Sequence, residues 1–208
     1  ELDDGCNLLA STLFDARLLS PADVWREVRL SVEFNRVRPA RAAAGFVDAT
    51  AATAVHDLFD NPARYLKRRV DLKAPQQKEL SMLAVVRLAA SDPESAAAEL
   101  EPLQKHLTGE QLAWAWAVTA KQAALKLLPQ AADMAQRAWR AQRPLGVPQW
   151  SDDALAWQVR AAVPRTVDDV VARSVTSAAR QRGVARVVDA AAFATMVGAT
   201  LDHLAPVT

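Results

Sequence analysis

Hydrophobic and small residues recur along this chain with the spacing of helices that are buried on more than one side. In residues 109–128 one apolar stripe is formed by Leu112, Ala115, Trp116, Thr119, Ala123 and Leu127, and a second by Trp114, Val118, Leu125 and Leu128. Only a narrow polar strip of Gln111, Gln122 and Lys126 is left to face water. Two apolar faces require two neighbours, so this pattern predicts an inner helix of a helical stack.

Prolines and capping residues divide the chain into pieces of helix length. Asn61-Pro62 and Asp92-Pro93 each combine a capping side chain with a proline at the first helical position. The short connections favour antiparallel helix pairs, and a composition with 6 glycines and 6% aromatic residues favours an all-α fold over a sheet. We predict helices at 4–18, 21–35, 39–54, 62–70, 75–90, 93–105, 109–128, 130–142, 152–163, 166–182 and 186–204.

One helix start occurs twice. The sequence Thr108-Gly-Glu-Gln-Leu-Ala-Trp114 returns 43 residues later as Ser151-Asp-Asp-Ala-Leu-Ala-Trp157. Both copies begin with a hydroxyl residue that can cap the first turn, Gln111 completes a capping box in the first copy, and Ser20-Pro21 with Asp23 follows the same rule. Repeat units bury their apolar faces against neighbours. We therefore expect stacked antiparallel helix pairs that form an α-superhelix, with Trp114, Trp116 and Trp157 largely buried.

Charge and cysteine content narrow the classes of function. The 25 Lys and Arg residues against 24 Asp and Glu residues leave a net charge of +1, so we expect neither nucleic acid nor an anionic membrane as a partner. The single cysteine, Cys6, excludes an internal disulfide. No apolar run reaches membrane-spanning length and the chain does not start with a basic-then-apolar signal segment, so we expect no membrane span. Because the chain starts at Glu1 rather than at Met, we expect a processed or excised piece.

Few residues have the spacing that catalysis or metal binding requires. His56, His106 and His203 lie far apart, and none has a second ligand three or four positions away. Cys6 has no base near it in the chain, and there is no glycine-rich phosphate loop and no nucleophile elbow. We expect no metal ion, no cofactor and no catalytic residue.

The strongest charge cluster is a candidate binding site. Arg64, Lys67 and Arg68 lie close together, with Tyr65, Arg69 and Lys73 around them, and Arg64 and Arg68 are one turn apart if the helix runs from 62 to 70. Such a face can hold carboxylate or phosphate groups. The alternative, which we favour on the near-neutral charge of the chain, is a solvated surface with no ligand.

Several motifs resemble those of the soluble periplasmic lytic transglycosylases. They are Arg-Leu-Ala-Ala-Ser-Asp-Pro-Glu at 87–94, Leu-Thr-Gly-Glu-Gln-Leu-Ala-Trp-Ala-Trp at 107–116, and Ser-Asp-Asp-Ala-Leu-Ala-Trp-Gln-Val-Arg-Ala-Ala at 151–162. The start Asp4-Gly-Cys-Asn7, followed by Leu18-Leu-Ser20 and Trp25-Arg26, is similar to the family segment in which a Cys-Asp or Cys-Asn helix precedes a Trp-Arg helix. The resemblance covers residues 1–163 and falls in the non-catalytic α-superhelical part of these proteins.

This resemblance implies a scaffold in cell-wall metabolism. In the family, a superhelical ring carries a lysozyme-like domain that cleaves the MurNAc–GlcNAc bond of peptidoglycan and leaves a 1,6-anhydro product. Its catalytic glutamate stands in a Glu-Ser dipeptide before a Gly-Leu-Met-Gln run, whereas Glu94-Ser95 runs into Ala-Ala-Ala-Glu, so no catalytic residue is carried over. We expect 1–163 to be a periplasmic scaffold domain that is inactive alone, with peptidoglycan glycan strands or the missing catalytic domain as its partner.

The last part of the chain departs from the family pattern, and other functions stay open. Residues 164–208 lack Trp and Tyr, so we expect a helical tail that is foreign to the family. A second interpretation of the whole chain is a helical-repeat adaptor, similar to tetratricopeptide proteins, that binds a protein or peptide in a concave groove. A third, nucleic-acid binding through 64–73 and the tail, is disfavoured by the low net charge.

Overall fold

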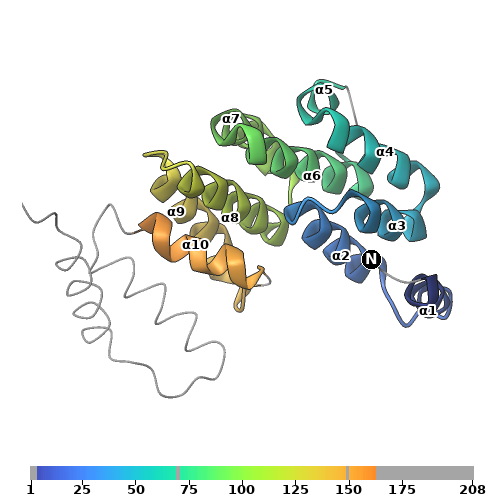
Figure 1. The fold of residues 1–208 in the computed structure, drawn as a ribbon. Helices are drawn as coiled ribbons and strands as arrows, with labels where there is room; N and C mark the ends of the chain where they lie inside the picture. The colour runs from blue at the N-terminus through green and yellow to red at the C-terminus, as the bar shows by residue number, and fades with distance from the viewer. Residues whose placement is uncertain (1–3, 69–70, 149, 163–208) are drawn as a thin grey trace, which may run out of the picture.

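The described part of the protein is built from helices and short connections (Figure 1). This computed structural model describes residues 4–68, 71–148 and 150–162, in which no β-strand occurs. The predicted all-α fold is therefore confirmed, whereas the helices predicted at 166–182 and 186–204 lie outside the described residues. None of the described helices combines the length and the apolarity needed to cross a membrane.

The elements are α1 (Asp4–Asp15), α2 (Pro21–Glu33), α3 (Val37–Val47), α4 (Ala49–Asp60), α5 (Pro62–Leu66), α6 (Pro75–Ser91), α7 (Pro93–Leu103), η1 (Gln104–His106), α8 (Gly109–Leu125), α9 (Ala131–Gln142), η2 (Arg143–Leu145) and α10 (Asp152–Ala162).

Capping side chains start α2, α5, α7, α8 and α10 where the sequence predicted them. At α8 the Thr108 hydroxyl accepts the Gln111 backbone N–H at 3.3 Å, and the Gln111 side-chain oxygen accepts the Thr108 N–H at 2.9 Å. The same capping box joins Ser20 and Asp23 at α2. These bonds satisfy N–H groups that have no partner within the helix. First-turn N–H groups are also accepted by Asn61 at α5, Asp92 at α7 and Ser151 at α10.

The single helix predicted at 39–54 is wrong, because the chain breaks at Asp48. This residue is extended, with φ −166° and ψ 140°, and its carboxylate accepts the Thr50 N–H at 3.0 Å. It therefore ends α3 and caps α4, which continues to Asp60. The Asp48 side chain forms a hydrogen bond with the backbone that competes with a continuous helix. The alanine-rich sequence on both sides favours a helix, so the pattern did not indicate this break.

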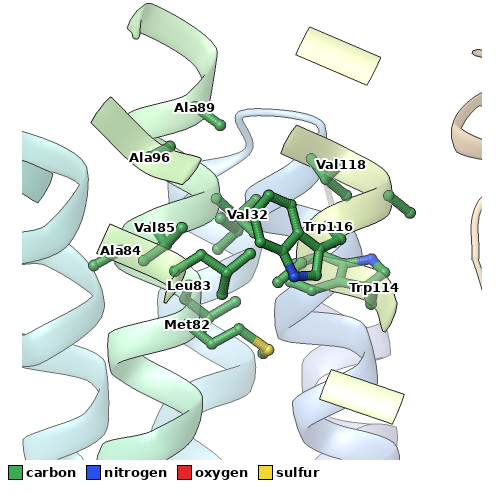
Figure 2. Close-up of a cluster of buried hydrophobic side chains, with 14 of the residues drawn as sticks. Val32, Met82, Leu83, Ala84, Val85, Ala89, Ala96, Trp114, Trp116 and Val118 are labelled. Carbon is green, nitrogen blue, oxygen red and sulfur yellow. The ribbon is translucent and has the colours of Figure 1, made fainter. Parts of the chain in front are cut away.

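The core lies where helices of neighbouring pairs meet. Consecutive helices are in contact in α2–α3, α3–α4, α6–α7 and α8–α9, and alternate helices are in contact in α4–α6, α6–α8 and α8–α10. As a result, α8 is covered on several sides, as its two apolar faces predicted. Trp114 and Trp116 are 4% and 2% exposed, and Figure 2 shows them beside the α6 side chains Met82, Leu83 and Val85. Burying two indole rings of this size is a large hydrophobic contribution to the stability of the fold.

Four positions of the predicted stack differ from expectation. Trp157 is only half-buried rather than largely buried. Gln111 was assigned to the polar strip, but it is 6% exposed and donates a hydrogen bond to Glu79. Leu125 and Leu127 were assigned to apolar stripes, yet they are 47% and 90% exposed, because α8 ends at Leu125 and the chain turns away at Leu127 with a φ of 56°.

Candidate binding surfaces

The predicted basic cluster is exposed, but it does not form one helix face. Asn61 caps α5 and Pro62 occupies its first turn, and the helix then ends at Leu66 after 5 residues. Lys67 and Arg68 therefore follow the helix, and the prediction of a helix over 62–70 is wrong. Arg64 and Lys67 are exposed and form no ion pair within the described residues. The one-turn spacing between Arg64 and Arg68 assumed in the sequence does not exist in the fold.

Arg68 forms an ion pair with another residue of the chain. Its guanidinium donates to the Asp57 carboxylate of α4 at 2.8 Å and lies 5.1 Å from the centre of the Tyr65 ring. Tyr65 is 4% exposed, and this burial raises the pKa of its phenol above the ordinary value of 10.0, against the opposing effect of the Arg68 charge. Arg68 thus links the end of α5 to α4, so that of the three candidate binding residues Arg64 and Lys67 are left available to a ligand.

The histidines do not form a site in the described residues. His56 is exposed and its Nδ1 lies 3.3 Å from Asp60, one turn later in the same helix. His106 is half-buried in η1, and His203 lies outside the described residues. Within the described stretches, no group of three His, Cys, Asp or Glu side chains is placed to hold a metal ion.

A polar network that the sequence did not reveal joins α2, α6 and α8, and we call it the Arg29 network. Arg29 donates to Glu79 through Nε at 3.1 Å and to Glu110 through Nη1 at 2.7 Å. Gln111 donates to Glu79 at 2.7 Å, so its capping box is joined to α6. Burial opposes the charged guanidinium, but the bonds and charges of Glu79 and Glu110 outweigh it and raise the pKa of Arg29.

The Arg29 network is a structural feature rather than a pocket. Both Glu79 oxygens accept hydrogen bonds from Arg29 and Gln111, so this carboxylate is held by its own chain. A hollow of about 10 Å³, lined in part by Arg29 and Glu110, has room for a single water. Two carboxylates around one guanidinium therefore link the three helices α2, α6 and α8.

A second network, which we call the Lys121 network, joins α2, α8 and the start of α10. The Lys121 ammonium lies 3.1 Å from Glu33 and 2.5 Å from Asp153. The Ser151 hydroxyl, which caps α10, also donates to Glu33 at 2.6 Å. A buried carboxylate needs such partners to offset its lost hydration. Ser151 was predicted as a cap, but its second role at Glu33 depends on a residue 118 positions away.

An apolar groove of about 580 Å³ lies at the end of α10, and we call it the C-terminal groove. It lies between the turn that joins α8 to α9 and the last turn of α10. Leu127, at its rim, is 90% exposed. Arg160 lies with its guanidinium 4.6 Å from the centre of the Trp157 ring. The residues that line it are Ala124, Leu127, Leu128, Pro129, Ala131, Ala132, Trp157, Arg160 and Ala161.

Sequence reasoning missed the C-terminal groove, although a signal was present. Leu127 and Leu128 were counted as helix positions, but they stand directly before Pro129. The residue before a proline disfavours the helical conformation, so an apolar pair here indicates an exposed turn. A comparison with protein-family models, with curated proteins and with solved structures finds no match to this chain.

Proposed function

We propose that this chain is a non-catalytic helical scaffold of a periplasmic lytic transglycosylase, which acts in peptidoglycan cleavage and turnover only together with a lysozyme-like domain. The observation that carries this proposal is the position of the motif residues. Asp92, Thr108, Gln111 and Ser151 cap α7, α8 and α10, and Trp114 and Trp116 fill the core. The motifs that carry the resemblance are therefore the residues that would hold a stack of helix pairs together.

The contacts between helices also support a superhelical scaffold. Helix α8 touches α6 and α7 on one side and α9 and α10 on the other, as an inner element of a repeat array does. A stack of this kind offers an extended surface rather than an enclosed pocket. That geometry suits a protein that positions a long polymer or another domain.

The Glu94-Ser95 dipeptide supports a role without catalysis. The Ser95 hydroxyl and backbone N–H both donate to the Asp92 carboxylate, at 2.6 and 3.0 Å. Glu94 accepts a hydrogen bond from Gln130 of the α8–α9 turn at 2.9 Å. Both side chains therefore serve the start of α7 and its contact with the next pair. General acid catalysis needs a carboxyl group aimed at a glycosidic oxygen, whereas Glu94 is exposed at a helix start and its carboxylate is bound by Gln130.

Co-sedimentation with purified peptidoglycan sacculi tests the proposal. Stem peptides carry carboxylates, so we expect the full chain to pellet with sacculi at low salt and to be released at high salt, where surface charges are screened. The variant Arg64→Glu/Lys67→Glu should pellet less. Arg68 is kept, because its loss would also break the pair with Asp57. The matched control Lys105→Glu/Arg143→Glu makes the same charge change at exposed positions elsewhere.

A second arm uses the lysozyme-like domain of a soluble lytic transglycosylase as an immobilised bait. Retention of this chain on that domain, and not on hen lysozyme, would support the scaffold function even if sacculi bind weakly. If the chain binds neither sacculi nor the domain, the proposed function is contradicted. Equal pelleting of the two charge-reversal variants would exclude Arg64 and Lys67 as the contact.

One observation favours the adaptor as a second candidate function. The C-terminal groove is apolar, open and large enough for one face of a short helix from a partner protein. An adaptor would present this groove to other proteins, whereas the scaffold would keep it covered. Whether the groove is covered in the full chain therefore separates the two functions.

A further inference from the structure

Helix α10 repeats the position of α8 within the stack. Helix α8 contacts both members of the pair before it, α6 and α7, and α10 likewise contacts α8 and α9. Each of α6 and α8 is followed by a helix that packs beside it. The described residues end with α10 at Ala162, so the element that would complete the third pair lies outside them.

The C-terminal groove lies where that element would pack. Arg160 and Ala161 are part of its lining, so the chain leaves α10 at the edge of the groove. In the preceding pair, α6 and α7, the equivalent surface is covered by the α8–α9 turn. There Lys126 donates to the Ser91 carbonyl and Gln130 donates to Glu94, which seats the α8–α9 turn on the α6–α7 turn. The α8–α9 turn has no such cover in the described residues, and Leu127 is 90% exposed.

The segment 166–182 has the pattern and the position to provide this cover. Its apolar positions Val167, Val170, Val171, Val175 and Ala178 share one helix face, while Asp169, Arg173, Thr176 and Arg180 lie on the other. Only Val163, Pro164 and Arg165 separate it from α10, and three residues reach at most about 10 Å. This short connection favours a position of the segment next to the groove. Pro164 favours a change of direction after α10.

We propose that residues 166–182 of this chain form a helix that lies in the C-terminal groove and covers Leu127 with its valine face. The short tether gives this segment a high effective concentration at the groove, which a second copy or a free peptide lacks. Both surfaces benefit, since the valine face and the groove each lose apolar contact with water. This proposal concerns the fold of the chain and does not rest on a role in peptidoglycan cleavage.

Thiol labelling of the full chain tests this contact. Cys6→Ser removes the only native thiol, and Leu127→Cys then places one at the groove. Lys105→Cys, at an exposed position in the 3-10 helix η1, is the reference for free access. With a bulky maleimide we expect Leu127→Cys to react about tenfold or more slowly than Lys105→Cys, because reaction requires local opening of the covering helix.

Two further variants assign the cover to the valine face. Adding Val171→Asp/Val175→Asp should bring the labelling of Leu127→Cys to within about twofold of the reference, since charge on the buried face favours the open state. Adding Thr176→Asp, on the opposite face, should leave it slow. Far-UV circular dichroism and tryptophan fluorescence establish that all variants keep the fold of the described helices.

Two outcomes would overturn the proposal. If Leu127→Cys reacts as fast as Lys105→Cys, the groove is open. If it is protected but Val171→Asp/Val175→Asp has no effect, something other than this segment covers the groove. Protection that then falls on dilution would assign the cover to a second copy of the chain.

Discussion

The Lys121 ammonium lies 3.1 Å from the Glu33 carboxylate, and the two side chains are 6% and 0% exposed. They come from α8 and α2, and Ser151 and Asp153 bring the start of α10 to the same point. A buried ion pair of this kind contributes little net stability, but removing one partner leaves an uncompensated charge. The Lys121 network therefore sets the register of three helices that are distant in sequence.

Replacing Lys121 by methionine should destabilise the fold by about 3–5 kcal/mol, because Glu33 stays buried without its main counter-charge. The double variant Lys121→Met/Glu33→Gln should be more stable than Lys121→Met alone. Urea denaturation of both single variants and of the double variant gives the coupling energy. Additive losses would mean that the two groups do not act as a pair.

Trp116→Ala should cost about 3–5 kcal/mol, since the indole is 2% exposed between α6 and α8 and Arg137 stacks on its ring. Thr108→Ala should cost about 1 kcal/mol through loss of the α8 cap. We predict that Trp116→Ala lowers the free energy of unfolding more than Thr108→Ala does, as measured by chemical denaturation. Equal small losses would place α8 at the periphery of the fold.

Acid should weaken the start of α7. The side-chain and backbone bonds from Ser95 hold the pKa of Asp92 below its ordinary value of 3.8. Because the folded pKa is the lower one, this cap is fully stabilising above the unfolded pKa and is lost as the pH falls through the folded pKa. Asp92→Asn keeps a capping side chain but removes the titration.

Thermal unfolding of Asp92→Asn and of the unsubstituted protein across the range from neutral pH to below pH 3.8 measures this effect. The difference between their melting temperatures should shrink or reverse in acid. A difference that stays constant across the range would show that Asp92 does not contribute to acid sensitivity.

The isolated chain should not release 1,6-anhydro products from sacculi, because Glu94 and Ser95 are bound within the α7 start and its neighbouring turn. Turbidity of a sacculus suspension, read together with mass detection of muropeptides, measures this. Adding an active lytic transglycosylase to a parallel sample controls for accessible substrate. Release of anhydro products by this chain alone would show that it has an active site elsewhere than at Glu94 and Ser95.

Local features of the fold were readable from the sequence. The capping residues at α2, α5, α7, α8 and α10 act on N–H groups within three residues, so short motifs predict them. The apolar faces of α8 depend only on the helical period, which made the burial of Trp114 and Trp116 predictable. The break at Asp48 was missed because its capping bond competes with a helix that its neighbours also favour.

The candidate surfaces depended on contacts that no local pattern contains. The sequence suggested that Arg68 could bind a ligand together with Arg64, but in the fold its guanidinium donates a hydrogen bond to Asp57. The helical pattern predicted that Gln111 faces solvent, but in the fold its side chain donates a hydrogen bond to Glu79 of α6. The C-terminal groove exists only because α10 packs beside the α8–α9 turn.

The sequence by itself determined the all-α fold, many of the helix starts and the two-sided burial of α8, because these follow from backbone hydrogen bonding and from the period of apolar side chains. Only the tertiary structure decided which charged groups pair, which cations stay exposed and where apolar surface is left uncovered. Glu33 and Lys121 are 88 residues apart, and Arg29 and Glu110 are 81 apart. Such pairs form only when packing brings separate helices together and removes water from between them, and no spacing along the chain encodes that event.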